Sequence, residues 1–180
     1  AQSEAFWQEV LRNVGYRNID NSPSTGTRQV VTLADDDSQA TRLQMLRDSA
    51  GRPHFYEFVT GTNRSWSSAE SAANARSYFG MSGYLARVNS SSENSLLAGL
   101  VPSGNQGWIG ASDRTTEGTW RWISGPEADD TIAGSDWENW NSGEPNDGGI
   151  FGSEDYALML SNGQWNDYDG SADYLVEYGS

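Results

Sequence analysis

Two short motifs constrain what this chain can fold into, because each places an acid beside an amide. Glu144-Pro145-Asn146 and Trp165-Asn166-Asp167 are separated in sequence, with Glu154 between them. Ca²⁺ takes about 6–8 oxygen ligands, among them carboxylate and carbonyl oxygens. A carboxylate bound through one oxygen can still accept a hydrogen bond, and a bound Asn can still donate from its NH₂. The sequence therefore predicts a joint site for Ca²⁺ and two adjacent sugar hydroxyls, formed by Glu144, Asn146, Glu154, Asn166 and Asp167.

The alternative interpretation is that Asp, Asn and Gly are simply common loop residues in this region. That interpretation explains their abundance, but it does not explain the repeated order of acid and amide. Crowded carboxylates in one loop raise each other's pKa values unless a cation lies among them. The large, loose ligand shell of Ca²⁺ suits a flexible loop better than the strict octahedron of Mg²⁺ does. We therefore favour the metal site.

Composition excludes several classes of function. The 180 residues suggest one domain, or one domain and a fragment. The formal net charge of −14 argues against nucleic acid as a partner, because phosphates require a basic face. No apolar run approaches the roughly 18 residues of a membrane span, so membrane insertion is not expected. The start of the chain also lacks the charged and apolar pattern of a signal peptide.

Two short helices and several short strands are predicted. Ser67-Ser68-Ala69-Glu70 and Ser90-Ser91-Ser92-Glu93 are capping-box patterns, and each is expected to open a helix. Gly80 is expected to end the first helix and Pro102 the second. Short apolar runs bounded by Gly, Asn and Ser predict strands at residues 84–88, 107–111, 119–123, 156–160 and 174–178.

Residues 124–154 show no periodicity and are rich in Gly, Asp, Asn, Pro and Trp. Irregular segments of this length are usually functional or disordered, and the motifs lie in or beside this one, so we predict a binding loop ordered by metal. Trp137 and Trp140 flank the site, and both sugar stacking and anchoring of the loop in the core remain open for them. His54 has no partner at metal-ligand spacing and receives no role. Core positions are expected for Trp108, Trp120, Trp122 and Trp165.

At its motifs the chain resembles the C-type lectin-like family, whose mannose-type members carry Glu-Pro-Asn and Trp-Asn-Asp in this order. The resemblance extends from about Pro53 to Tyr178. It also includes Trp108-Ile109-Gly110, residues 143–147, Glu154-Asp155 and Leu175-Val176-Glu177-Tyr178. A single tripeptide would be weak support, whereas this ordered set is specific. The resemblance implies an α+β fold with two helices, two small antiparallel sheets and a long loop ordered by Ca²⁺.

The resemblance also implies roles for individual residues. The five acid and amide residues above would form the principal Ca²⁺ and sugar site. A cis peptide bond between Glu144 and Pro145, tolerable before proline, would turn both side-chain carbonyls toward the ion. The acids that match those holding an auxiliary, loop-bracing Ca²⁺ in the family are Asp113, Glu117, Asp147 and Asp155. Glu154 is a candidate for both sites.

The complete absence of cysteine departs from the family, because animal members are normally stapled by disulfides. In an alignment of the motifs, the positions where the family often has Cys are occupied here by Tyr156, Gly170 and Val176. In the first helix, Ala72 or Ala73 stands at such a position. Loss of a disulfide from a small secreted domain costs about 2–5 kcal/mol. Aromatic packing and Ca²⁺ are the expected sources of compensating stability. A chain without cysteine fits a bacterial surface protein better than an animal secreted one.

Residues 1–50 are predicted to be distinct from the remainder. Residues 10–18 and 26–33 resemble strands of cadherin-like β-sandwich repeats in giant bacterial adhesins. Asp35-Asp36-Asp37 either binds Ca²⁺ at a module junction or is a solvated acidic turn. A complete sandwich usually needs about 100 residues. We therefore predict that residues 1–50 are a β-sandwich fragment, part of a split module, and that residues 51–180 are the lectin-like domain.

These features predict a Ca²⁺-dependent carbohydrate-binding module of a secreted bacterial adhesin of the repeats-in-toxin type, located on the cell surface. Its expected partners are cell-surface glycans that present adjacent hydroxyls of fucose, mannose, glucose or N-acetylglucosamine. The alternative is a Ca²⁺-stabilised module that binds proteins or peptides and does not recognise sugar. Catalysis is not expected, because a glycosidase built on Glu144 and Glu154 would need one protonated acid, and carboxylates bound to Ca²⁺ stay ionised.

Overall fold

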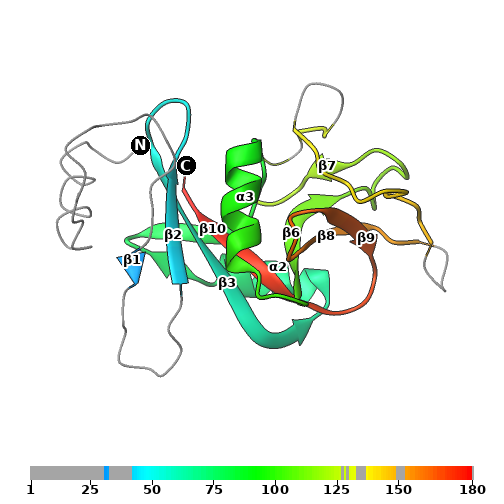
Figure 1. The fold of residues 1–180 in the computed structure, drawn as a ribbon, viewed down its shortest axis with the longest axis horizontal. Helices are drawn as coiled ribbons and strands as arrows, with labels where there is room; N and C mark the ends of the chain where they lie inside the picture. The colour runs from blue at the N-terminus through cyan, green and yellow to red at the C-terminus, as the bar shows by residue number, and fades with distance from the viewer. Residues whose placement is uncertain are drawn as a thin grey trace.

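One connected sheet forms the frame on which the two motifs lie (Figure 1). The computed structural model describes residues 31–32, 42–126, 128, 130–132, 137–148 and 153–179. Neighbouring strands follow the order β1-β2-β3-β10-β6-β8-β9, and β5 also pairs with β10, β4 with β5, and β7 with β6. The strands are β1 Val31–Thr32, β2 Arg42–Arg47, β3 Pro53–Arg64, β4 Ser77–Tyr78, β5 Met81–Leu85, β6 Gln106–Ser112, β7 Arg121–Trp122, β8 Tyr156–Leu160, β9 Trp165–Tyr168 and β10 Ala172–Tyr178.

The C-terminal strand β10 occupies the centre of this sheet. It runs antiparallel to β3 and β5 and parallel to β6. Most of its residues are buried on both faces, as a central strand of a covered sheet requires. The α+β class is confirmed. The two small antiparallel sheets that we expected are joined here into one mixed sheet, because β10 returns to lie beside β6 in the same direction.

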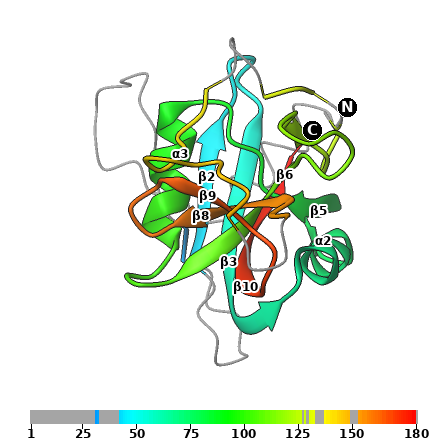
Figure 2. The same cartoon turned by 90° about the vertical axis from the view of Figure 1, so that its right-hand side faces the viewer.

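The two predicted helices cover opposite faces of the sheet. They are α2, Trp66–Asn74, and α3, Ser91–Leu100, and Figure 2 shows them on either side of β3 and β10. Successive residues of β10 belong to two different buried clusters: Leu175 is in the cluster that includes Leu97 of α3, and Val176 is in the one that includes Trp66 of α2. Among the described residues, no helix combines the length and the apolarity needed to cross a membrane.

Helix α3 begins and ends where the sequence predicts. Ser90 is its N-cap, and the Ser90 side chain accepts a hydrogen bond from the Glu93 backbone N–H at 3.2 Å. The other half of the pattern differs, because the Glu93 carboxylate accepts from the backbone N–H of Asn89 rather than from that of Ser90. The helix ends at Leu100, two residues before Pro102.

Helix α2 begins two residues earlier than predicted. Its N-cap is Ser65, not Ser67, because Trp66 is buried and its indole Nε1 donates to the Ile109 carbonyl at 2.8 Å. The helix ends at Asn74, so the prediction that Gly80 ends it is wrong. Gly80 lies instead in the turn between β4 and β5, where its positive φ of 76° favours glycine.

The strand predictions are confirmed for β6, β7, β8 and β10, and residues 156–160 match β8 at both ends. The prediction for residues 84–88 overlaps only the end of β5. The strands β2, β3 and β9 were not predicted. β2 pairs with β3 from Arg47 opposite Pro53 to Gln44 opposite Tyr56, so residues before position 51 extend the same sheet. Residues 10–18, 26–30 and Asp35-Asp36-Asp37 lie outside the described residues.

At Tyr156, one of the positions where the family often has a disulfide, the structure has aromatic packing. The Tyr156 ring stacks on Trp66 at 4.9 Å between centroids and meets Trp108 edge-on at 6.4 Å. Trp137 and Trp140 both contact Trp165 edge-on, at 5.8 Å and 5.6 Å, so they anchor the loop to the core. The core positions predicted for Trp108, Trp120, Trp122 and Trp165 are confirmed, since each is buried.

Candidate functional site

Asp167, on β9, connects the two motifs. Its Oδ2 atom accepts hydrogen bonds from the backbone N–H groups of Asn146 at 2.9 Å and Asp147 at 2.7 Å. The residue is only 1% exposed, and its Oδ1 atom is buried without a hydrogen-bond partner. Burying an ionised oxygen without a partner is costly. This oxygen is therefore the feature of the site that most requires a cation.

Glu144 and Asn146 lie together on the loop side of the site. The Asn146 Nδ2 atom donates to Glu144 Oε2. The peptide bond between Glu144 and Pro145 is cis, as the sequence predicts. Burial and the adjacent Asp167 carboxylate raise the pKa of Glu144 to about 7. Glu144 is thus a carboxylate held close to a second carboxylate.

Glu154 approaches the same group from the far end of the loop. Its backbone N–H donates to Asp147 Oδ1 at 2.8 Å. Burial and the charges of Asp167 and Asp169 raise the pKa of Glu154. Asp169 was not among the predicted site residues. It directly follows β9, two positions after Asp167, and the two-residue period of strands would have drawn attention to it.

Asn166 is the predicted site residue whose amide has a local backbone partner. Its Nδ2 atom donates to the backbone carbonyl of Asp167 at 2.8 Å. The structure therefore gathers Glu144, Asn146, Glu154 and Asp167 by hydrogen bonds or electrostatic contact. Asn166 lies on the same strand as Asp167.

A second acidic group lies where β6 ends. Single carboxylate oxygens of Asp113, Glu117 and Asp155 all lie within 4.8 Å of one another. Asp113 Oδ2 accepts from the Gly118 N–H at 2.9 Å, whereas Asp113 Oδ1 is buried without a partner. Burial and the nearby Glu117 raise the pKa of Asp113 to about 6. Asp147, the fourth predicted member, lies outside this trio and contacts the backbone of Glu154.

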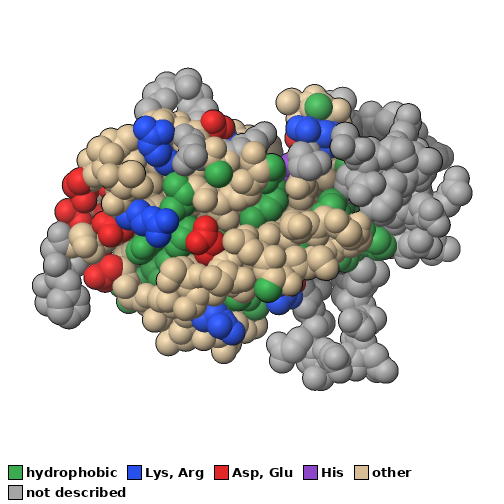
Figure 3. Space-filling view, turned by 180° about the vertical axis from the view of Figure 1, so that it is seen from behind, with side chains coloured by type: hydrophobic (Ala, Val, Ile, Leu, Met, Phe, Trp, Pro, Cys, Tyr) green, Lys and Arg blue, Asp and Glu red, His purple; other side chains and the backbone are tan. Residues whose placement is uncertain are grey.

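Both groups fit a hard divalent cation. Their donors are oxygens only, which is the ligand preference of Ca²⁺, and each group contains one buried carboxylate oxygen without a partner. Acidic side chains gather at this end of the molecule (Figure 3). Glu144, Asn146, Glu154, Asn166 and Asp167 would hold one ion, and Asp113, Glu117 and Asp155 a second.

The elevated pKa values give a testable pH dependence. Without Ca²⁺, Glu144 and Asp113 bind more protons in the folded chain than in the unfolded chain, because burial and neighbouring carboxylates raise their pKa values. Stability without Ca²⁺ should therefore fall as the pH rises from about 4 to 7. Ca²⁺ binds the deprotonated carboxylates, so the increase in melting temperature that Ca²⁺ causes should grow over this range. Melting curves recorded with Ca²⁺ and with chelator at each pH measure this increase. An increase that stays constant from about pH 4 to 7 would contradict the prediction.

Asn94, on α3, positions the strand and loop that carry the motifs. Its Oδ1 accepts from Trp165 Nε1 at 2.9 Å, and its Nδ2 donates to the Gly163 carbonyl at 3.0 Å. The same carbonyl accepts from Asn139 Nδ2 at 2.8 Å. The backbone of Trp165 in turn bonds to Asn139 and Asn141 of the loop. A buried amide thus connects α3, the β8–β9 turn and the binding loop.

Asn94→Ala is expected to lower the free energy of unfolding by about 1–3 kcal/mol, because it leaves the buried Trp165 Nε1 without an acceptor. Urea denaturation measures this loss. The control is Ser95→Ala, at an exposed position of the same helix, which should change stability by less than about 0.5 kcal/mol. Equal stability of the two variants would exclude the positioning role of Asn94.

The sequence comparisons agree with this geometry. Residues 62–176 match the Lectin C-type domain family. Halomucin of Haloquadratum walsbyi is 33% identical over 181 residues, which cover 96% of this chain but 2% of that protein. The mannose-binding protein of Gallus gallus is 35% identical over 85 residues, covering 47% of this chain and 30% of that protein. The chain therefore spans only a small part of the curated relatives that it matches.

Comparison with solved structures also finds C-type lectin domains. The mouse scavenger receptor C-type lectin carbohydrate-recognition domain has a TM-score of 0.59 at 23% identity, covering 74% of this chain and 93% of that chain. The cow CD23 carbohydrate-recognition domain, solved in the presence of a GlcNAc2Man3 oligosaccharide, has a TM-score of 0.56 at 27% identity and covers 71% and 88%. The fold is therefore that of C-type lectin domains. The chain belongs to the C-type lectin domain family.

Proposed function

We propose that this chain is a Ca²⁺-dependent carbohydrate-binding module. The observation that carries the proposal is Asp167, whose buried Oδ2 binds the backbone of the Glu-Pro-Asn segment while its Oδ1 has no hydrogen-bond donor among the described residues. This oxygen could therefore bind a cation that is shared by both motifs. The ion would offset the repulsion among Glu144, Glu154 and Asp167, and it would contact sugar hydroxyls directly.

The side chains of the proposed principal site would read the geometry of two hydroxyls. Glu144 accepts a hydrogen bond from one hydroxyl while Asn146 donates a hydrogen bond to the oxygen of that hydroxyl. Glu154 and Asn166 do the same for the second hydroxyl. In the sugar-bound state, the hydrogen bond that Asn146 now donates to Glu144 is replaced by bonds to the ligand. Neighbouring hydroxyls of one pyranose ring match this alternation of acceptors and donors.

Mannose-type sugars are the proposed ligands, namely fucose, mannose, glucose and N-acetylglucosamine. The Glu-Pro-Asn order supports this choice through the family resemblance. Two relatives add support: the mannose-binding protein of Gallus gallus, by its name, and the cow CD23 domain, solved with a GlcNAc2Man3 oligosaccharide present. Affinity for a single sugar should be weak at an open site, so useful adhesion would come from many copies.

The auxiliary ion is proposed to brace the loop. Asp113, Glu117 and Asp155 supply its carboxylates, and Asp147 contacts the backbone of Glu154 directly beside Asp155. The backbone N–H of Asp113 also donates to the Asp155 carbonyl at 3.3 Å, which ties the end of the loop to the end of β6. An ion here would hold Glu154 in place for the principal site.

We place this module at the ligand-binding end of a secreted bacterial adhesin, outside the cell and at its surface. Residues 1–50 would belong to a split β module that carries the lectin-like domain of residues 51–180. Alignment of nearly the whole chain with 2% of halomucin supports a place within a much longer protein. Family membership favours binding over catalysis.

The second candidate is a Ca²⁺-stabilised module that binds a protein or peptide. It is weakened by the presence of all five acid and amide residues of the principal site. A glycan array probed with and without Ca²⁺ tests both candidates. Binding to mannose-type glycans that disappears with chelator supports the lectin, whereas a blank array from a protein that still binds Ca²⁺ favours the second candidate.

A further inference from the structure

A cavity of about 320 Å³ lies among the ends of several elements away from the candidate sugar loop. The β2–β3 turn, the start of α3, the end of β10 and residues 87–89 supply its walls. In Figure 1 the β2–β3 hairpin and the loop that bears the sugar motifs lie at opposite sides of the molecule. The volume falls at the lower end of the range of small-molecule sites, roughly 300–1,000 Å³.

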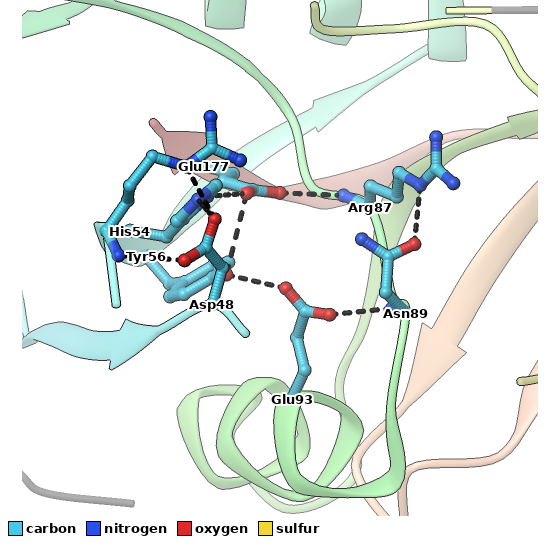
Figure 4. Close-up of polar contacts among 8 residues, drawn as sticks. Asp48, His54, Tyr56, Arg87, Asn89, Glu93 and Glu177 are labelled. Atoms are coloured by element: carbon cyan, nitrogen blue, oxygen red, sulfur yellow. Dashed lines mark hydrogen bonds and ion pairs between the residues drawn. The ribbon is translucent and has the colours of Figure 1, made fainter. Parts of the chain in front are cut away.

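Buried carboxylates line the inner wall of this cavity (Figure 4). Glu93 of α3 is 6% exposed and Glu177 of β10 is 3% exposed. The Tyr56 hydroxyl lies between them, 2.5 Å from Glu93 Oε1 and 3.5 Å from Glu177 Oε1. Backbone N–H groups of Asn89 and Arg87 donate to the outer oxygens of Glu93 and Glu177 respectively. Two carboxylates are therefore held on either side of one phenol.

The positive charges around the cavity already have anionic or carbonyl partners. Arg52 pairs with Asp48 at 2.7 Å, Arg87 with Asp130 at 2.7 Å, and Arg47 donates to the Gly51 carbonyl. His54 remains as the counter-ion for the two inner carboxylates, with Nδ1 at 2.6 Å from Glu177 Oε1. Even a protonated His54 would balance only one of the two carboxylates, so the inner wall keeps an excess of at least one negative charge in either state of the imidazole.

His54 also presents an atom without a partner. Its Nε2 is buried, makes no hydrogen bond, and lies 3.8 Å from Asp48 Oδ2, too far for a direct bond. A nitrogen placed about 2.9 Å from each of these two atoms would bridge them with ordinary hydrogen bonds. With the Nδ1 hydrogen donated to Glu177, a neutral imidazole accepts at Nε2. Asp48 Oδ2 already accepts from Arg52 Nε at 2.7 Å, and a carboxylate oxygen can accept a second donor, so Nε2 and Oδ2 then form an acceptor pair for a donor with positive charge.

We propose that this cavity binds a primary ammonium group of another molecule, held by His54 Nε2 and Asp48 Oδ2 and facing Glu93 and Glu177. A compact ammonium with three donors suits separate acceptors on different elements, whereas a guanidinium prefers two oxygens of one carboxylate. All 11 residues counted as lysine or arginine are arginine, so no lysine of this chain can fill the site. The ammonium comes from an amino sugar or from a lysine-like side chain of a partner.

The same geometry gives the site a pH dependence. The hydrogen bond and charge of Glu177 outweigh the effect of burial and raise the pKa of His54, with Asp48 and Glu93 adding to the rise. Burial and the charge of Glu177 raise the pKa of Glu93 to about 7. At acid pH both groups carry protons and the excess negative charge disappears. Amine affinity should therefore rise as the pH increases from about 6 to 8, as long as the ligand stays protonated.

Nuclear magnetic resonance of the histidine ring provides a direct test, because His54 is the only histidine of the chain. The chain is kept in Ca²⁺, and salt is matched between samples. The probes are Nα-acetyl-lysine amide and glucosamine, each paired with its neutral form, the Nε-acetylated lysine derivative and N-acetylglucosamine. We expect at least one cationic probe to lower the pKa of His54, because the bound ammonium competes with the proton at Nε2. The neutral forms should leave it unchanged.

Asp48→Asn tests the proposed contact and also removes the acceptor of the Arg52 Nε bond at 2.7 Å. The amide oxygen can still accept from the backbone N–H groups of Ala50 and Arg52, which now bond to Asp48 Oδ1, while Oδ2 becomes a donor that repels the ammonium. Affinity should fall at least about 10-fold. Glu138→Gln removes an exposed carboxylate outside the cavity and should leave it unchanged. Glu93→Gln gives a second test of the charge if Asp48→Asn disturbs the turn.

The outcomes distinguish the two sources of the ammonium group from each other and from failure of the proposal. A response to glucosamine alone identifies an amino sugar, and a response to the lysine derivative alone identifies a protein side chain. Failure of both cationic probes to move the pKa of His54 overturns the proposal. An equal effect of a neutral form, or unchanged affinity in the Asp48 and Glu93 variants, does so as well. None of these readouts uses the two acid and amide motifs at residues 144–146 and 165–167, so failure of the sugar site would leave the test intact.

Discussion

Removal of Ca²⁺ by a chelator is expected to abolish glycan binding and to lower the melting temperature by roughly 5–10 °C. A metal that binds only the folded state at about 100 times its dissociation constant stabilises it by about 2.7 kcal/mol, and about 1 kcal/mol corresponds to roughly 2–4 °C for a chain of this size. The physical source is the crowding of Glu144, Glu154 and Asp167, which repel one another without a cation. Calorimetry and a glycan-binding assay measure the two effects on the same samples.

A matched pair of variants assigns this effect to the principal site. In Asp167→Asn, one amide oxygen can still accept from the loop backbone, but the unpartnered Oδ1 is replaced by an NH₂ that repels a cation. Asp173 resembles Asp167 in accepting two backbone N–H groups, from Thr62 and Asn63, but it lies on β10. Asp173→Asn should lower stability yet keep both the response to Ca²⁺ and sugar binding. If Asp167→Asn retained them too, the principal site would be refuted.

The sequence predicted the features that depend on local chemistry. The Ser90 cap, the stop before Pro102 and the apolar run of β8 each follow from a few neighbouring residues, and each is confirmed. The acid and amide motifs also indicated which segments meet, because one ion needs ligands from both. Long-range contacts then bring Asn146 to Asp167. The metal and sugar roles of these residues remain predictions.

Other features depended on tertiary contacts that no local pattern reports. Helix α2 begins at Trp66 because the indole finds the Ile109 carbonyl across the core, which the capping-box pattern cannot predict. The strand β3 alternates poorly between apolar and polar residues, and its end bonds to the side chain of Asp173 on β10, a contact that the local sequence does not report. The division at residue 50 remains a prediction, although β2 pairs with β3 across it.

His54 shows the same limitation most clearly. Its sequence neighbours offer no partner at metal-ligand spacing, so the sequence alone predicts no role for it. In the fold its partners are Glu177 at 2.6 Å and, at 3.8 Å, Asp48, which come from β10 and from the β2–β3 turn. His54 thus finds its nearest charged partner 123 positions away in sequence, and the register of β3 against β10 brings the two residues together.

Asn146→Asp is expected to keep Ca²⁺ and to lose sugar. The new carboxylate still offers oxygen to the ion, but the NH₂ that would donate to the sugar oxygen is gone, and a second acceptor faces the hydroxyl. Loss of a hydrogen bond to a charged or metal-bound group costs about 1.5–3 kcal/mol, so affinity for a mannose-type glycan should fall roughly 10–100-fold. Asn166→Asp should likewise keep Ca²⁺ and lower the affinity for the glycan, through the second hydroxyl. Calorimetric titration with Ca²⁺ and then with glycan separates the two steps.

The control for this pair is Asn162→Asp, because Asn162 is exposed in the β8–β9 turn and its Oδ1 accepts from the Gln164 backbone, a bond that Asp can also accept. It adds the same negative charge outside the proposed site and should leave both titrations unchanged. Sugar affinity equal to that of the wild type in Asn146→Asp and Asn166→Asp would show that the amides are not donors to the ligand. Loss of Ca²⁺ together with sugar would instead assign them to the metal alone, because then the donor role could no longer be separated from ligation.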